Sequence, residues 1–290
     1  MRVRVVFDTN CFTPQHFDIL DSSPMRQLCH AGRIVAVYGH VFLEEMLRSY
    51  GNDAKRRDLA TRWMPFLMDT AGRLNDDFVS IWHSELVCGR GVHARRFMPL
   101  KRQEYLFENC HDMPLDGTWK IWREVQDELR VENAKRAKMR ELSKEVRLQV
   151  RDWTRLIRYS RKRHGVPVFA DTLSSEADRS GREFIVKKIE AYNPVEVANR
   201  WSRAKDFYPY FTTFVQTILY MPFYASVYAN DRIDLNAQAD LDLMTHLLHA
   251  DVLVSNEQGF LQRAFDDLWR PRGKVLMNSE QFVRFLRKLA

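Results

Sequence analysis

The sequence predicts an α/β protein, a three-layer α/β/α domain whose parallel sheet is built from both ends of the chain. Apolar segments with the length of buried strands alternate with amphipathic helical segments at the start of the chain. The same alternation returns near its end. The segment between, residues 51–229, is mostly helical and too patterned to be a loop. We therefore expect a discontinuous α/β domain, 1–50 and 230–290, with a large helical insertion at 51–229.

Composition excludes several classes of protein. The chain has 290 residues, of which 45% are hydrophobic and 12% aromatic, so it has enough apolar side chains for a core and is not of a disordered type. No apolar run approaches the roughly 20 residues that span a bilayer, and the first residues lead straight into a strand rather than a signal peptide. We expect a cytoplasmic protein. The four cysteines show no Cys-x-x-Cys pair, which argues against a disulfide framework or a zinc site.

The first 50 residues predict two strands and two helices. A β-branched run ends at Asp8, and the run Ile-Val-Ala-Val-Tyr at 34–38 is apolar throughout, as is typical of a strand buried on both faces. Ser23 and Pro24 have the residue types of a helix start. The expected elements are a strand at 3–7, a loop bearing Pro14, a helix from Ser23 to His30, a strand at 34–38 and a helix at 41–50.

The middle of the chain predicts helices without a convincing strand, because its apolar residues recur at steps of three and four. The expected helices are 54–71, 76–87, one or two long helices over 119–163, and 184–191, 194–205 and 209–228, with a basic loop at 90–102.

The alternation of helix and strand resumes after residue 235. Val-Leu-Val at 252–254 is a short buried strand, and Asn278 followed by Gln281 has the spacing of a capping box. The expected elements are a helix at 236–249, strands at 252–254 and 274–277, and helices at 260–269 and from Asn278 to Leu289.

Four acids are placed to meet at one edge of this sheet. Asp8 and Glu257 follow strands, Asp240 lies in the first turn of a helix, and Glu45 lies two turns into another. Ligands collect outside the carboxyl ends of strands in an open α/β sheet. Clustered carboxylates repel one another unless a cation screens them, and hard oxygen ligands suit Mg²⁺ or Mn²⁺. We therefore expect a divalent-metal site, of the kind that activates water and holds phosphate oxygens for in-line displacement.

These segments together resemble the PIN-domain nucleases. The resemblance rests on Phe-Asp-Thr-Asn at 7–10, Val-Phe-Leu-Glu-Glu at 41–45, the helix that begins at Asp240, and Asp-Val-Leu-Val-Ser-Asn-Glu at 251–257. It covers about 1–50 and 232–290. It implies a Mg²⁺- or Mn²⁺-dependent nuclease of RNA or single-stranded DNA that leaves a 5′-phosphate and a 3′-hydroxyl. It also implies catalytic and metal-binding roles for Asp8, Glu45, Asp240 and Glu257, with Asn10 and Ser255 as supports.

The sequence departs from the family pattern near its fourth acid. Glu257 stands where the family usually has Asp, and Gly259 precedes Phe260 where many members carry another acid. An inactive relative that only binds nucleic acid or a protein is therefore a second reading, as is a toxin-type ribonuclease restrained by a partner.

Each acid also has an alternative. Glu44 competes with Glu45, and Asp234 and Asp242 compete with Asp240 for the inward position. Asp8 alone could cap the turn after its strand, and Asp240 alone could complement a helix dipole.

One segment carries the positive charge. Between residues 118 and 164 there are 15 Lys and Arg against 7 Asp and Glu, while the whole chain has a formal charge of +7. Such a run is often a solvated helix face, but it also suits a surface that tracks phosphates. The candidate nucleic-acid-binding residues are Arg147, Arg151, Arg155, Arg158 and Arg161, with Arg90, Arg95, Arg96, Lys101 and Arg102 as additions and Trp153 and Tyr159 as candidates for base stacking. A homodimer or a protein partner is left open.

Overall fold

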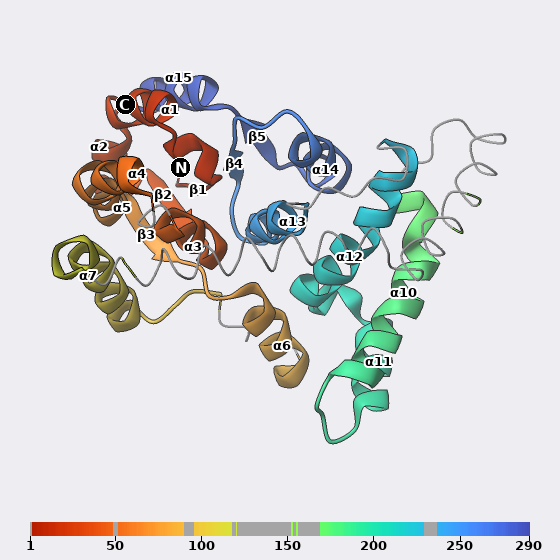
Figure 1. Cartoon of the computed structure of the whole chain (residues 1–290). Helices are drawn as coiled ribbons and strands as arrows, with labels where there is room; N and C mark the ends of the chain where they lie inside the picture. Colours follow the sequence, from red (N-terminus) through yellow and green to blue (C-terminus); the bar gives the residue numbers. More distant parts are fainter. Residues whose placement is uncertain are drawn as a thin grey trace.

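A five-stranded parallel sheet lies at the centre of the computed structural model of the chain (Figure 1). The structure describes residues 2–48, 52–89, 96–117, 120, 152, 155, 169–228 and 237–290. The strand order is β3-β2-β1-β4-β5, and every pairing is parallel. The strands are β1 (Val3–Phe7), β2 (Ile34–Tyr38), β3 (Ala71–Leu74), β4 (Val252–Val254) and β5 (Val275–Met277).

The two ends of the chain meet at the centre of the sheet. Val5 of β1 pairs with Ala36 of β2 on one side and with Val252 of β4 on the other. The chain runs outward from β1 to β3, and it resumes on the other side of β1 with β4 and β5. The predicted parallel α/β sheet built from both ends is therefore confirmed. The strand order reverses between β1 and β4, and in such sheets this reversal opens a crevice at the carboxyl ends of the two strands.

Alternate residues of the strands enter two separate cores, one on each face of the sheet. In β1, Val5 and Phe7 belong to one core and Val6 to the other. This alternation is the period of two that a strand imposes. The first core includes side chains from α1 (Pro14–Asp21), α2 (Met25–His30), α3 (His40–Arg48), α5 (Met64–Thr70), α7 (Leu100–Asp116) and α15 (Ser279–Leu289). The second includes side chains from α6 (Phe78–Cys88), α10 (Phe169–Lys188), α11 (Pro194–Arg203), α12 (Pro209–Val227), α13 (Ala237–Thr245) and α14 (Phe260–Leu268).

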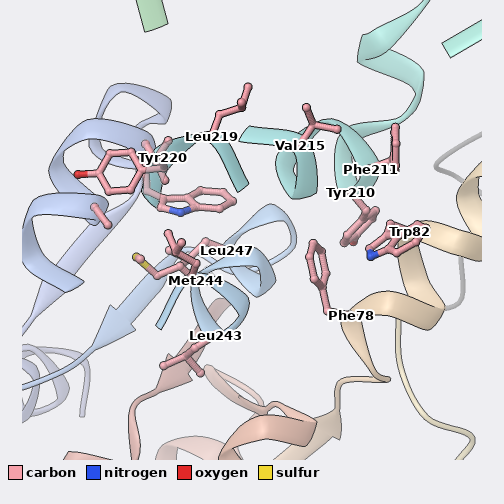
Figure 2. Close-up of a cluster of buried hydrophobic side chains, with 14 of the residues drawn as sticks. Phe78, Trp82, Tyr210, Phe211, Val215, Leu219, Tyr220, Leu243, Met244 and Leu247 are labelled. Atoms are coloured by element: carbon pink, nitrogen blue, oxygen red, sulfur yellow. The ribbon is translucent and has the colours of Figure 1, made fainter. Parts of the chain in front are cut away.

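Aromatic side chains of the middle segment build much of the second core. Figure 2 shows Phe78 and Trp82 of α6 facing Tyr210 and Phe211 of α12. The ring of Trp82 stacks on that of Phe214, with centroids 4.7 Å apart and an interplanar angle of 20°. The helices α6 and α12 therefore pack against each other, and α12 also packs against α13. The division of the chain into 1–50 with 230–290 and an insertion at 51–229 stays a prediction.

The strand β3 is missing from the sequence-based expectation, which had a helix through Ala71. Before β3 the helical segment consists of α4 (Asp53–Asp58), a π-helical turn (Leu59–Trp63) and α5, and it ends at Thr70. In β3 only Leu74 is fully buried, because this strand lies at the edge of the sheet. A short edge strand reading Ala-Gly-Arg-Leu has neither a continuous apolar run nor an alternation of apolar and polar residues.

Three helices also differ from expectation. The expected loop at Pro14 is the helix α1, which begins with that proline, a residue favoured at the first helical position. The basic loop expected to end at residue 102 gives way to α7 at Leu100, directly after Pro99. The helix expected at 184–191 begins far earlier, at Phe169. At the start of each of these helices the apolar residues do not recur at the three- and four-residue steps from which a helix is predicted.

A glycine in α10 allows the close approach of α11. A Cβ atom on Gly181 would lie 2.1 Å from Cη2 of Trp201, whose indole is fully buried and donates to Thr212 Oγ1 at 3.1 Å. Replacing a mid-helix Gly with Ala ordinarily stabilises a helix by about 1 kcal/mol. Here we expect Gly181→Ala to lower the free energy of unfolding by about 1–3 kcal/mol, measured by chemical denaturation, because it overpacks the contact. In a Trp201→Phe background the penalty should shrink, whereas a stabilised Gly181→Ala protein would contradict this account.

Candidate active site

Asp8 lies at the carboxyl ends of the neighbouring strands β1 and β4. This residue directly follows β1, and its backbone N–H donates to the carbonyl of Val254, the last residue of β4, at 2.9 Å. Asp8 thus stands at the carboxyl end of the central strand pair. The sheet topology therefore places this carboxylate at the position predicted from the strand pattern.

Short hydrogen bonds hold the Asp8 carboxylate in place. Its Oδ2 accepts from Asn10 Nδ2 and from Ser255 Oγ, each at 2.6 Å. Its Oδ1 accepts from the Asn10 backbone N–H at 3.3 Å, and Thr9 Oγ1 lies 3.4 Å from the same oxygen. Asp8 is buried, and this burial raises the pKa of its carboxyl above the ordinary value, although the hydrogen bonds lower it. The ionised form is therefore costly in the crevice unless a further positive charge stabilises it.

Thr9 links Asp8 to the second acid. Its Oγ1 donates to Glu45 Oε2 at 2.8 Å, which ties α3 to the end of β1. Sequence reasoning assigned Thr9 no role, although it lies between two residues that were singled out. The position of Thr9 between Asp8 and Asn10 was the one feature of the sequence that could have indicated its role.

A second set of polar contacts supports this first one. Asn10 Nδ2 also approaches Ser255 Oγ at 3.1 Å, and its Oδ1 accepts the Asn256 N–H at 3.0 Å. The side chain of Asn256 in turn accepts the backbone N–H of Ser279 at 3.0 Å and donates to its Oγ at 2.8 Å. Asn10 and Ser255 thus both donate to the Asp8 carboxylate, and their role as supports of a metal ligand stays a prediction. Asn256, which sequence reasoning missed, connects them to the first turn of α15.

Three of the four predicted acids line one pocket. Asp8, Glu45 and Asp240 come from the end of β1, from α3 and from the first turn of α13, and they share the pocket with Thr9. The pocket opens to the surface, and the empty volume of about 230 Å³ at this position includes part of the open solvent. Its apolar wall consists of Val41, Phe42, Ala239 and Leu243.

The fourth predicted acid, Glu257, is not among the lining residues of this pocket. Its backbone N–H donates to Ser255 Oγ at 3.1 Å, so it lies beside the supports of Asp8. Its Oε1 accepts the N–H of Leu261 at 3.4 Å, in the first turn of α14. In this geometry the longer side chain of Glu257 reaches the start of a helix, where a carboxylate is electrostatically favoured.

The structure also bears on the alternatives. Asp242 accepts from Gln238 Nε2 at 2.7 Å, and the pocket is lined by Asp240 instead. Burial raises the pKa of Asp242 to about 6, with the charge of Asp77 adding to the shift. Asp234 and the side chain of Glu44 lie outside the described residues.

Most of the predicted phosphate-binding residues lie outside the described part of the chain. Arg155 is among the described residues and is exposed. Its Nη1 lies 4.0 Å from Oδ1 of Asp152. Of the additions, Arg96 has its guanidinium 5.9 Å from the ring centroid of Tyr210, and Lys101 and Arg102 are exposed on α7. The residues outside the described ranges are Arg90, Arg95, Arg147, Arg151, Trp153, Arg158, Tyr159 and Arg161.

The donors at the pocket suit a hard divalent cation, since carboxylate oxygens are the ligands that Mg²⁺ and Mn²⁺ prefer. The buried Asp8, whose charged form is disfavoured, is the kind of ligand that a bound cation stabilises. In the described ranges, however, no group of three or more His, Cys, Asp or Glu side chains is arranged so that it could hold a metal ion. The three acids therefore share a pocket without forming an assembled coordination shell.

Comparisons of the chain with protein-family models, with curated proteins and with solved structures found no match. Across the part of the chain that the structure describes, no helix combines the length and the apolar character needed to cross a membrane. The function is therefore argued from the site itself.

Proposed function

We propose that the chain is a Mg²⁺- or Mn²⁺-dependent nuclease that hydrolyses phosphodiester bonds of RNA or single-stranded DNA at the pocket of Asp8, Glu45 and Asp240. One observation carries the proposal: acids separated by up to 232 residues in the sequence line one pocket at the reversal point of the sheet. The resemblance of these segments to PIN-domain nucleases, in matching order along the chain, supports it.

Each residue of the site has a definable task in such a reaction. A divalent cation, when bound, would polarise the phosphate and lower the pKa of the attacking water. Asp8, fixed by Asn10 and Ser255, offers a ligand of defined orientation. Thr9 donates a hydrogen bond that fixes Glu45, and Asp240 supplies a third carboxylate from α13. We assign Glu257, whose carboxylate contacts the first turn of α14, a role that assists the three acids of the pocket.

A second candidate is a nucleic-acid-binding or protein-interaction module without catalysis. Two observations favour it: within the described residues no assembled metal-binding group is present, and the Glu257 carboxylate contacts α14. In that case the pocket would bind without cleaving.

A cleavage assay separates the two candidates. Labelled single-stranded RNA and DNA of one sequence are incubated with the protein in Mn²⁺, in Mg²⁺ and in EDTA. The nuclease proposal predicts products with 5′-phosphate and 3′-hydroxyl ends in metal and intact substrate in EDTA, with RNA cut at least as fast as DNA. Binding of intact strands under all three conditions would instead support the module.

A further inference from the structure

A tyrosine and an arginine form an exposed pair where α12 ends and α14 begins. Tyr228 directly follows α12 and is 38% exposed, and Arg263 lies exposed in the first turn of α14. The guanidinium carbon of Arg263 stands 5.4 Å from the centroid of the Tyr228 ring. The pair therefore presents an aromatic ring and a positive charge together at the surface.

Contacts with the core fix the position of this pair. The Tyr228 ring lies 5.6 Å from that of Tyr224, which in turn meets the buried ring of Phe260 edge-on at 4.7 Å. The Tyr228 hydroxyl is hydrogen-bonded to Asp267, which also accepts from Tyr220 at 2.7 Å. A ring held at its hydroxyl and along one side loses little further freedom when a ligand binds.

The pair adjoins the elements that carry the candidate site. The helix α14 begins five residues after Ser255, the residue that donates to Asp8, and Glu257 bonds to its first turn. The helix α13, which brings Asp240 to the pocket, packs against both α12 and α14 (Figure 1). The Tyr228–Arg263 pair and the pocket are thus fixed to the same group of helices.

We infer that Tyr228 and Arg263 form a stacking site for an unpaired base of the nucleic-acid strand that enters the pocket, an inference that rests on the proposed function. Aromatic rings and guanidinium planes both stack on bases, and the cation also attracts the phosphate backbone. An unpaired base is required because a paired base keeps its faces within the duplex. The pair therefore selects single strands over duplexes.

The inference is tested by measuring RNA binding in EDTA, which removes the divalent cation and so prevents metal-dependent cleavage during the measurement. The probe is a short labelled single-stranded RNA, followed by fluorescence anisotropy, beside an abasic strand of equal length. Tyr228→Leu should weaken RNA binding by about 10-fold, while Tyr228→Phe, which keeps the ring but loses the hydroxyl bond to Asp267, should lose clearly less than Tyr228→Leu. Binding of the abasic strand should be equal in all proteins. Tyr192→Leu, which alters a fully exposed tyrosine beyond α10, is the matched control and should have no effect.

The outcomes separate this inference from the nuclease proposal. The stacking site is overturned if Tyr228→Leu binds RNA as tightly as the wild type does. It is also overturned if this variant loses as much affinity for the abasic strand as for RNA, even when cleavage is intact. Selective loss on RNA in a protein that cleaves nothing supports the stacking site and rejects the nuclease. Thermal unfolding of Tyr228→Leu shows whether the fold is retained, and the Tyr228→Phe result holds independently because that change keeps the ring.

Discussion

Replacing Asp8 with Asn is expected to lower the rate of metal-dependent cleavage by at least about 100-fold, since even altered support of a metal ligand costs 10- to 100-fold. Asp8 lines the pocket, and its carboxylate accepts hydrogen bonds from Asn10 and Ser255. The amide removes the negative charge while keeping the shape. The measurement is the initial rate of RNA cleavage in Mn²⁺.

Loss of folding does not account for the expected effect. The amide oxygen that Asp8→Asn introduces can accept both short bonds, from Asn10 and Ser255, and only the longer bond from the Asn10 backbone N–H is lost. Burial raises the pKa of Asp8, so its ionised form costs stability at neutral pH, and the Asp8→Asn protein should unfold at an equal or higher temperature. Asp251→Asn, a change at the opposite end of β4, is the control and should cleave normally. Cleavage by Asp8→Asn at the wild-type rate would reject the assignment.

A second large effect is expected at Glu85, a buried residue of α6. Its two oxygens accept the backbone N–H groups of Phe211 at 2.8 Å and Tyr210 at 3.3 Å, in the first turn of α12. A helix start has backbone donors without partners, and this carboxylate supplies an acceptor from another helix. Burial nevertheless raises the pKa of Glu85 to about 7, against the lowering effects of the two bonds and of Arg96.

The raised pKa makes the contribution of Glu85 to stability dependent on pH. The folded protein holds the Glu85 proton more tightly than the unfolded chain, so this contribution is greatest at low pH and is lost as the pH rises through about 7. A shift from 4.5 to about 7 corresponds to about 3 kcal/mol. Between about pH 5 and pH 8 the free energy of unfolding of the wild type should therefore fall by up to that amount relative to Glu85→Gln. Equal pH slopes for the two proteins, measured by denaturation in urea, would contradict the prediction.

Strands could be predicted from the sequence where their burial in the fold produces a visible run of apolar residues. The strands β1, β2 and β4 are buried near the sheet centre, so nearly every residue is apolar and the run is visible. The edge strand β3 has one buried residue, and nothing local distinguishes Ala71 from the helix before it. The shared pocket of Asp8, Glu45 and Asp240 could be expected because parallel strands bring their carboxyl ends to one edge.

Buried polar contacts between distant segments could not be predicted. His249 Nε2 lies 2.7 Å from Asn75 Oδ1, and its Nδ1 lies 2.9 Å from the hydroxyl of Tyr210, in a buried chain of three side chains. Burial holds the pKa of His249 near 2, so this imidazole stays neutral. Such pairs join segments up to 174 residues apart and leave no periodic signal. The bond from Glu85 to α12 escaped prediction for the same reason.

The central claim is that a divalent cation is shared by the acids of the pocket. Its most direct test is Mn²⁺ binding to the wild type, to Asp240→Asn and to Asp242→Asn, followed by calorimetric titration. The two aspartates lie two residues apart on α13, but only Asp240 lines the pocket. We predict that Asp240→Asn weakens Mn²⁺ binding by at least about 10-fold and that Asp242→Asn binds like the wild type. Equal affinity in all three proteins, or no binding to any of them, would contradict the claim.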